Sequence, residues 1–160
     1  MQKPVLLPPG GTLGDYVPFY FAPLSPMLYA IHRGQVEGYV GGQSEVVHLA
    51  STVEAVAEAK LAWVFTEGHA EIRFTGFFND LGDLDKIDWG VMRGRYWYDT
   101  DNDPDRKRRR QAEFLVRDFF PWALISHIGV CNRNAELLVT QALEHSPHKP
   151  NAAVERSWYY

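Results

Sequence analysis

Prolines and glycines interrupt the first third of the sequence so often that no long helix or long central strand fits there. Pro8, Pro9, Gly10 and Gly11 follow one another, and three further prolines divide residues 15–29. Proline fixes φ and has no backbone N–H, and a glycine inside a regular element costs conformational entropy. We therefore expect this chain to be built from short elements that are joined by turns and extended loops.

Composition narrows the class of protein. The 160 residues are 46% hydrophobic and 22% charged, which is typical of a globular domain and not of a disordered or fibrous chain. The apolar runs are shorter than the roughly 18–20 residues that span a bilayer, so no membrane contact is expected. The one cysteine, Cys131, excludes a disulfide framework and a Cys-rich zinc module, and it fits a cytoplasmic location.

The apolar patterns predict a mixed α+β domain with few, short helices. We predict strands over residues 27–32, 45–50, 62–67, 111–120, 129–132 and 153–160. We predict helices from residue 51 or 52 onward, around residues 81–89, over one or two turns of residues 122–128, and over residues 133–145. The first 14 residues are predicted to be a loop.

Glu113 is a charged residue inside an apolar segment, "QAEFLVRDFF". Alternation along the predicted strand places Gln111 and Glu113 on one face and Ala112 and Phe114 on the other. A carboxylate in such a segment loses hydration unless it has a partner or a function. Two interpretations stay open: a structural glutamate paired with a nearby arginine, and a catalytic carboxylate.

The segment Asp99–Arg110 is predicted to be an exposed loop with an acidic half and a basic half. Such runs are usually solvated charges. Because Tyr96, Trp97 and Tyr98 come just before it, a second interpretation is a loop that holds a single nucleic-acid strand, with charges for phosphates and rings for bases. The net charge of −4 does not exclude a local basic patch of this kind.

Several common chemistries have no support in the sequence. A GxGxxG turn after a strand, a P-loop and a GxSxG turn are all missing, so a Rossmann oxidoreductase, a P-loop NTPase and an α/β-hydrolase are not indicated. His32, His48 and His69 lack the spacing of metal ligands, and no metal site is expected. The aromatic run "YVPFYF" offers rings that could stack on a nicotinamide or an adenine.

Six blocks of the sequence follow one another from about Gly10 to Tyr160: "GDYVPFYFAPLSPMLYAIH", "GGQSEVVHL", "FTEGHA", "LDKIDW", "RRQAEFLV" and the closing "WYY". Together they resemble the DarT family of toxins from DarT/DarG toxin–antitoxin systems. The resemblance implies an ADP-ribosyltransferase fold related to the poly(ADP-ribose) polymerases. It also implies an enzyme that cleaves NAD, attaches ADP-ribose to thymidine in single-stranded DNA, and is countered by a DarG-like antitoxin with a macrodomain.

The resemblance also assigns residues. It implies that Glu113 is the catalytic carboxylate and that Arg95–Arg110 is the substrate-recognition turn. The expected NAD-binding residues are Tyr20, Phe21 and Gln111, and the expected DNA-binding residues are Met27, His69, Arg108, Arg109 and Arg110.

One part of the family pattern has no counterpart in this sequence. The family has a further N-terminal region of roughly fifty residues, with an NAD-binding histidine and an arginine. We therefore expect a single ADP-ribosyltransferase-like domain over residues 1–160 that lacks this NAD-binding segment. The alternative is a truncated, non-catalytic module of the same fold that binds single-stranded DNA; RNA or protein as the acceptor is a third possibility.

Overall fold

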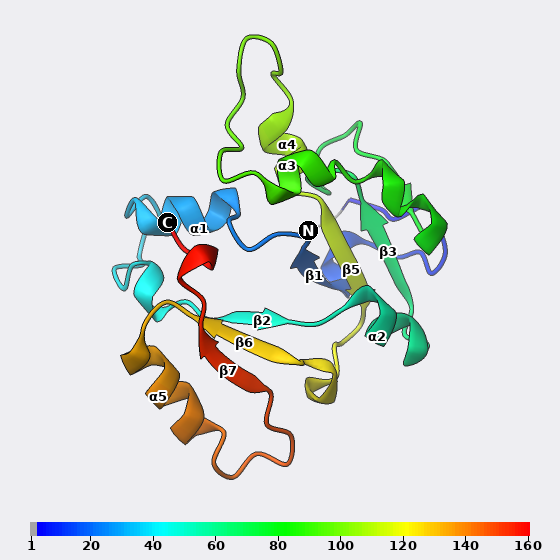
Figure 1. The fold of residues 1–160 in the computed structure, drawn as a ribbon. Helices are drawn as coiled ribbons and strands as arrows, with labels where there is room; N and C mark the ends of the chain where they lie inside the picture. Colours follow the sequence, from blue (N-terminus) through cyan, green and yellow to red (C-terminus); the bar gives the residue numbers. More distant parts are fainter. Residues whose placement is uncertain (1–2) are drawn as a thin grey trace. The chain divides into compact units, whose positions relative to one another are not determined.

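The computed structural model describes residues 3–160 and divides into two compact units (Figure 1). The first unit is made of Met1–Ser25 and Glu58–Phe120, and the second of Pro26–Ala57 and Pro121–Tyr160. Each unit has its own sheet, with short helices beside it, so the α+β prediction is confirmed.

The first unit contains a four-stranded antiparallel sheet. Its order is β1 (Tyr16–Tyr20), β5 (Glu113–Arg117), β3 (Trp63–Thr66) and β4 (Phe77–Phe78). Pro18 is tolerated in β1 because this strand lies at the edge of the sheet, where one side needs no ladder hydrogen bonds. The strand predicted over residues 62–67 is confirmed as β3.

The two faces of this sheet have different packing. One face carries Leu115 and Val64, which belong to an apolar cluster with Val5, Leu13, Tyr16 and Ala70. On the opposite face, Phe114 stacks on Trp63 with 5.1 Å between ring centroids and belongs to an aromatic layer. Neighbours along a strand point to opposite faces, so Glu113 shares the face of Leu115 and not that of Phe114.

The loop predicted for the first 14 residues is confirmed over residues 3–12; residues 1–2 lie outside the described part of the chain, and the turn η1 (Leu13–Asp15) follows. Gly10 and Gly11 have φ values of 79° and 87°, in the region that favours glycine. The Tyr16 hydroxyl donates to the Gly10 carbonyl at 2.6 Å, and Arg117 donates to the Pro9 carbonyl at 2.7 Å. These bonds fix the loop against the ends of β1 and β5.

The helices of the first unit are short, with three to six residues each. They are η1 (Leu13–Asp15), η3 (Leu81–Lys86), α3 (Trp89–Arg93) and α4 (Arg106–Arg110). The helical segment predicted near residues 81–89 is therefore present as η3 and the start of α3. The Asp88 side chain caps α3 by accepting from the Val91 N–H at 2.9 Å.

The prediction that Asp99–Arg110 is an exposed loop is wrong for its basic half. Arg106–Arg110 forms α4, and Arg110 is only 2% exposed. Its guanidinium donates to the carbonyls of Leu24 at 2.9 Å, Val91 at 2.5 Å, Met92 at 2.7 Å and Gly94 at 2.9 Å. These carbonyl acceptors offset the hydration that the buried charge has lost.

The second unit contains a three-stranded sheet in the order β2 (His48–Ala50), β6 (His127–Val130) and β7 (Asn151–Val154). β2 and β6 are antiparallel, and β6 and β7 are parallel. The parallel pair requires a crossover, which α5 (Arg133–Ala142) provides. Asn132 caps α5 by accepting from the Ala135 N–H at 2.9 Å, and the amphipathic helix predicted over residues 133–145 is confirmed over most of its length.

Two further predicted strands of this unit differ in the structure. Residues 27–32 form the helix α1 (Pro26–His32), because Pro26 occupies a first helical position that it suits. Residues 45–50 form a strand only over β2, after the turn η2 (Gln43–Glu45). The predicted helix near residue 52 is confirmed as α2 (Val53–Glu58), where the Thr52 hydroxyl accepts from the Ala55 N–H at 3.1 Å.

The helix and the strand predicted for the C-terminal half of this unit are also shorter in the structure. Residues 122–128 make only the turn η4 (Trp122–Leu124) before β6 begins, and the closing strand stops at Val154, before the turn η5 (Arg156–Trp158). The Tyr159 hydroxyl lies 2.8 Å from the Val46 carbonyl and 3.0 Å from the Gly129 carbonyl. These contacts hold the chain end against β6 and against the segment before β2. Within residues 3–160, no helix is long and apolar enough to cross a membrane.

We predict that Arg110→Met lowers the free energy of unfolding by at least about 2 kcal/mol, because it leaves buried carbonyls without a donor. The matched control is Arg133→Met, whose side chain is 87% exposed and which we expect to stay within about 0.5 kcal/mol of the parent. Urea unfolding measures both values. Equal effects of the two substitutions would contradict a structural role for Arg110.

Candidate active site

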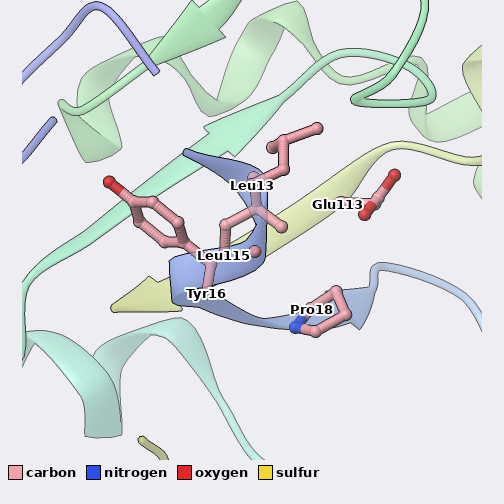
Figure 2. Close-up of a pocket in the computed structure, with 6 residues that line it drawn as sticks. Leu13, Tyr16, Pro18, Glu113 and Leu115 are labelled. Atoms are coloured by element: carbon pink, nitrogen blue, oxygen red, sulfur yellow. The ribbon is translucent and has the colours of Figure 1, made fainter. Parts of the chain in front are cut away.

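Glu113 begins β5 beside a pocket in the first unit (Figure 2). The pocket is lined by Leu13, Gly14, Tyr16, Pro18, Glu113 and Leu115. Except for the carboxylate, this lining is largely apolar, and the Glu113 side chain is only 10% exposed. A charge in such a place needs fixed hydrogen-bond donors to offset its lost hydration.

Thr66 fixes the start of β5. Its hydroxyl accepts from the Glu113 N–H at 3.1 Å and donates to the Gly68 carbonyl at 2.7 Å. Thr66 is fully buried, so this hydroxyl is an internal bridge between β3 and β5. The bond from the Glu113 N–H to this hydroxyl fixes the backbone from which the Glu113 side chain projects.

Two groups from one loop hold the Glu113 carboxylate. Oε1 accepts from the Ala70 N–H at 3.0 Å and lies 3.2 Å from Nδ1 of His69. Within residues 3–160, the hydrogen bonds of this carboxylate all end on Oε1, and no arginine pairs with it. The structural interpretation, a glutamate clamped by an arginine, is therefore wrong. Oε2 is the oxygen that remains for a ligand.

Lys3 holds the same loop from the other side. Its Nζ donates to the carbonyls of Ala70 at 2.5 Å and Ile72 at 2.6 Å, and it lies 5.1 Å from the ring centroid of Phe77. Burial lowers the pKa of Lys3, while the charges of Glu71 and Glu113 act in the opposite direction. Lys3 therefore adds positive charge near the carboxylate without contacting it.

Tyr20 lies directly opposite Glu113 in the β1–β5 register. Burial, together with the charge of Glu113, raises the pKa of the Tyr20 hydroxyl, so this group stays protonated around neutral pH. The residue is still 37% exposed. Of the residues expected to bind NAD, Tyr20 is the one that the structure brings beside the carboxylate.

Phe21 and Gln111 lie elsewhere. The Phe21 ring packs edge-on against Phe114 at 6.2 Å and against Trp89 at 5.8 Å, in the aromatic layer on the face opposite Glu113. Gln111 is the C-cap of α4 and not a strand residue, with φ −96° and ψ 24°. Strand alternation therefore does not place Gln111 on the face of Glu113. Its Nε2 donates instead to the Lys107 carbonyl at 3.1 Å.

The three arginines expected to bind DNA are engaged within the protein. Arg110 is buried, as described above, and is not available to a phosphate. Arg109 pairs with Asp88 and Asp103. Arg108 pairs with Asp105 and Glu67; the hydrogen bond with Asp105 raises the pKa of Arg108 and lowers the pKa of Asp105. Asp103 and Asp105 of the acidic half thus pair with Arg109 and Arg108 of the basic half.

The structure treats the two other predicted DNA-binding residues differently. His69 contacts Glu113, and its side chain is 31% exposed, so it can also meet a substrate. Met27 is 57% exposed on α1 and belongs to the second unit, where its contact with a base stays a prediction.

Sequence reasoning missed Thr66, Ala70 and Lys3. Thr66 is detectable as a polar residue at the end of an apolar strand. Ala70 acts through its backbone N–H, so its side chain gives no indication. Lys3 reaches the loop across 67 positions of sequence, a distance that no local pattern reports.

The arrangement favours one kind of chemistry. A carboxylate in an apolar pocket, with one oxygen fixed and the other open, stabilises developing positive charge and accepts a proton. Within residues 3–160, no three His, Cys, Asp or Glu side chains cluster as metal ligands would.

Comparisons with known proteins identify the family of this chain. The family model described as "ssDNA thymidine ADP-ribosyltransferase, DarT" matches residues 1–160. A DNA ADP-ribosyl transferase of Thermus aquaticus is 44% identical over 161 residues, which cover 99% of this chain and 69% of that protein.

Solved structures show the same fold. The structure of Thermus sp. 2.9 DarT in complex with ADP-ribosylated ssDNA has a TM-score of 0.94 and 42% identity, over 99% of this chain and 75% of that one. The complex of the same protein with NAD⁺ has a TM-score of 0.93 and 43% identity, over 98% of this chain and 78% of that one. The predicted ADP-ribosyltransferase fold is confirmed, and the chain belongs to the DarT family.

Proposed function

We propose that this protein is an NAD-dependent ADP-ribosyltransferase that modifies a thymidine base in single-stranded DNA and releases nicotinamide. The observation that carries this proposal is the Glu113 carboxylate, held at Oε1 and open at Oε2, beside a pocket in a DarT-family chain. The complexes of Thermus sp. 2.9 DarT with NAD⁺ and with ADP-ribosylated ssDNA support the choice of co-substrate and acceptor.

Glu113 has two tasks in this reaction. NAD supplies the ADP-ribose group and a nicotinamide that leaves with the electron pair of its bond to ribose. Oε2 of Glu113 accepts a hydrogen bond from the ribose 2′-hydroxyl and stabilises the positive charge that develops on the sugar. The carboxylate then takes the proton of the base nitrogen that forms the new bond to ribose. The products are ADP-ribosylated DNA, nicotinamide and a proton.

His69 and the Ala70 N–H keep the carboxylate in place during both tasks. Because both contact Oε1, the other oxygen keeps a fixed direction while the charge on the sugar changes. Preorganised contacts of this kind need no rearrangement as the reaction proceeds. We assign His69 to the DNA side of Glu113, and its side chain, which is 31% exposed, can meet a substrate there.

Tyr20 is proposed to contact the nicotinamide side of NAD, and Met27 to contact the DNA base. Tyr20 is the register partner of Glu113 and is partly exposed, so the flat nicotinamide ring can stack on the Tyr20 ring. A single strand suits the reaction because its bases need no unpairing before they enter a site.

We also propose the biological setting that the family implies. The two compact units together make one ADP-ribosyltransferase domain, a proposal that the family match over residues 1–160 supports. The protein acts as a cytoplasmic toxin, and its partner is a DarG-like antitoxin whose macrodomain removes the ADP-ribose.

We predict that Glu113→Gln lowers ADP-ribosylation of a thymidine-containing oligonucleotide by about 100–1,000-fold, the loss typical of removing one stabilising group from a transition state. Mass spectrometry of the oligonucleotide and nicotinamide release measure the effect. Glu58→Gln removes an exposed carboxylate and is the matched control, with activity expected to be unchanged.

Two results would contradict this proposal. The first is full activity of Glu113→Gln. The second is salt-sensitive oligonucleotide binding by the parent protein without any nicotinamide release, which would instead identify a non-catalytic DNA-binding module.

We predict that the ring of Tyr20, and not its hydroxyl, contributes to NAD binding. Tyr20→Ala should raise the KM for NAD by about 10-fold, since an aromatic pair contributes about 0.5–1.5 kcal/mol beyond its buried area. Tyr20→Phe keeps the ring and should change this KM by less than about 2-fold. Steady-state kinetics with varied NAD tests both variants, and equal KM values for the two would show that the ring is not used.

A further inference from the structure

Arg108 lies at the centre of a closed set of contacts. Its Nε and Nη2 donate to the two oxygens of Asp105, each at 2.7 Å. Its Nη1 donates to Glu67 at 2.5 Å and to the Thr75 hydroxyl at 3.3 Å. All three guanidinium nitrogens are thus engaged, and the side chain is only 15% exposed.

These contacts connect α4 to the loop over residues 67–76. Glu67 also accepts from the Gly76 N–H at 2.9 Å, which closes the base of this loop. Inside it, the Thr75 hydroxyl donates to the His69 carbonyl at 2.8 Å. A β-carbon on Gly68 would lie 2.2 Å from Nη1 of Arg108, so the guanidinium fits only because residue 68 has no side chain.

The same loop supplies both groups that hold the catalytic carboxylate, His69 and the Ala70 N–H. The backbone of Arg108 is also part of this connection. Its carbonyl accepts from the His69 N–H at 3.0 Å and from the Gln111 N–H at 3.1 Å, two residues before Glu113. Arg108 therefore contacts the segment that holds the carboxylate and the segment that carries it.

We propose that Arg108 is a positioning residue for Glu113, acting through Glu67 and the 67–76 loop, and not a ligand of a DNA phosphate. This inference rests on the proposed function of Glu113. The Arg108 guanidinium holds the loop at a fixed distance from Glu113. His69 and the Ala70 N–H on that loop then orient the Glu113 carboxylate. Two carboxylates already neutralise it, and their charge would repel a phosphate at the same place.

The experiment compares Arg108→Lys with Glu67→Gln in the full chain. Lys keeps the charge but loses the planar fork, and Gln still accepts from Gly76 while weakening the bond to Arg108. We expect each variant to lower kcat by about 10-fold or more, because small displacements of a catalytic group are costly. The KM for the oligonucleotide and the salt dependence of its binding should stay unchanged.

The double variant provides a second kinetic readout. Since both substitutions break the same connection, the pair should lower kcat little further than either alone. Lys86→Gln removes an exposed charge and is the control, with kcat expected to be unchanged. Thermal unfolding of every variant checks that it is folded; if Arg108→Lys does not fold, Glu67→Gln alone decides the question.

A phosphate-binding role gives the opposite pattern. Glu67→Gln would then leave kcat unchanged, and Arg108→Gln would weaken oligonucleotide binding and reduce its salt slope by about one. That pattern would overturn the proposal.

Hydrogen exchange of the Ala70 amide separates this inference from the proposed function. This amide donates to Glu113, so Glu67→Gln and Arg108→Lys should speed its exchange by about 10-fold or more if they release the loop. An unchanged exchange rate would overturn the positioning role. A parent protein that shows no transfer activity, with the exchange effect intact, would instead count against the proposed function alone.

Discussion

The hydrogen bond from the Ala70 N–H to Oε1 of Glu113 is the interaction on which the site depends. A carboxylate that is 10% exposed beside an apolar pocket is unfavourable without donors, and this bond and the His69 contact supply them. Both donors act on one oxygen. Because both contacts are to Oε1, the carboxylate is held in place while Oε2 remains for a substrate hydroxyl.

The rest of the first unit supports that pair of contacts. Thr66 fixes the backbone of Glu113, Lys3 holds the carbonyls of the donor loop, and Arg108 connects the loop to α4. The apolar cluster that contains Leu115 and Val64 packs closely on the sheet and keeps the strands that carry these residues rigid. In the sequence, the basic residues of α4 resemble a nucleic-acid-binding surface. In the structure, Arg108 and Arg109 form ion pairs within the protein.

The position of Glu113 in the fold was predictable from the sequence, and for a physical reason. A glutamate within an apolar strand is costly enough to be noticed, and the resemblance of the six blocks to the DarT family implies its chemistry. The short strand β3, the cap of α2 and the amphipathic helix α5 were also predictable, because local periodicity and capping determine them.

The failures have a different origin. Arg108, Arg109 and Arg110 read as a solvated or phosphate-binding run, because sequence does not show which carboxylates and carbonyls a guanidinium meets in space. Alternation places Gln111 on the face of Glu113 only if the strand begins at residue 111, whereas β5 begins two residues later. Long-range partners such as Lys3 have no local pattern at all.

The most direct measurement of the central claim compares NAD with an analogue that lacks the 2′-hydroxyl of the nicotinamide ribose. Nicotinamide release in the presence of a thymidine oligonucleotide is measured for the parent protein and for Glu113→Gln. If Oε2 of Glu113 binds that hydroxyl, the parent should favour NAD over the analogue much more strongly than the variant does. Equal preference in the two proteins would contradict the claim that this oxygen stabilises the sugar.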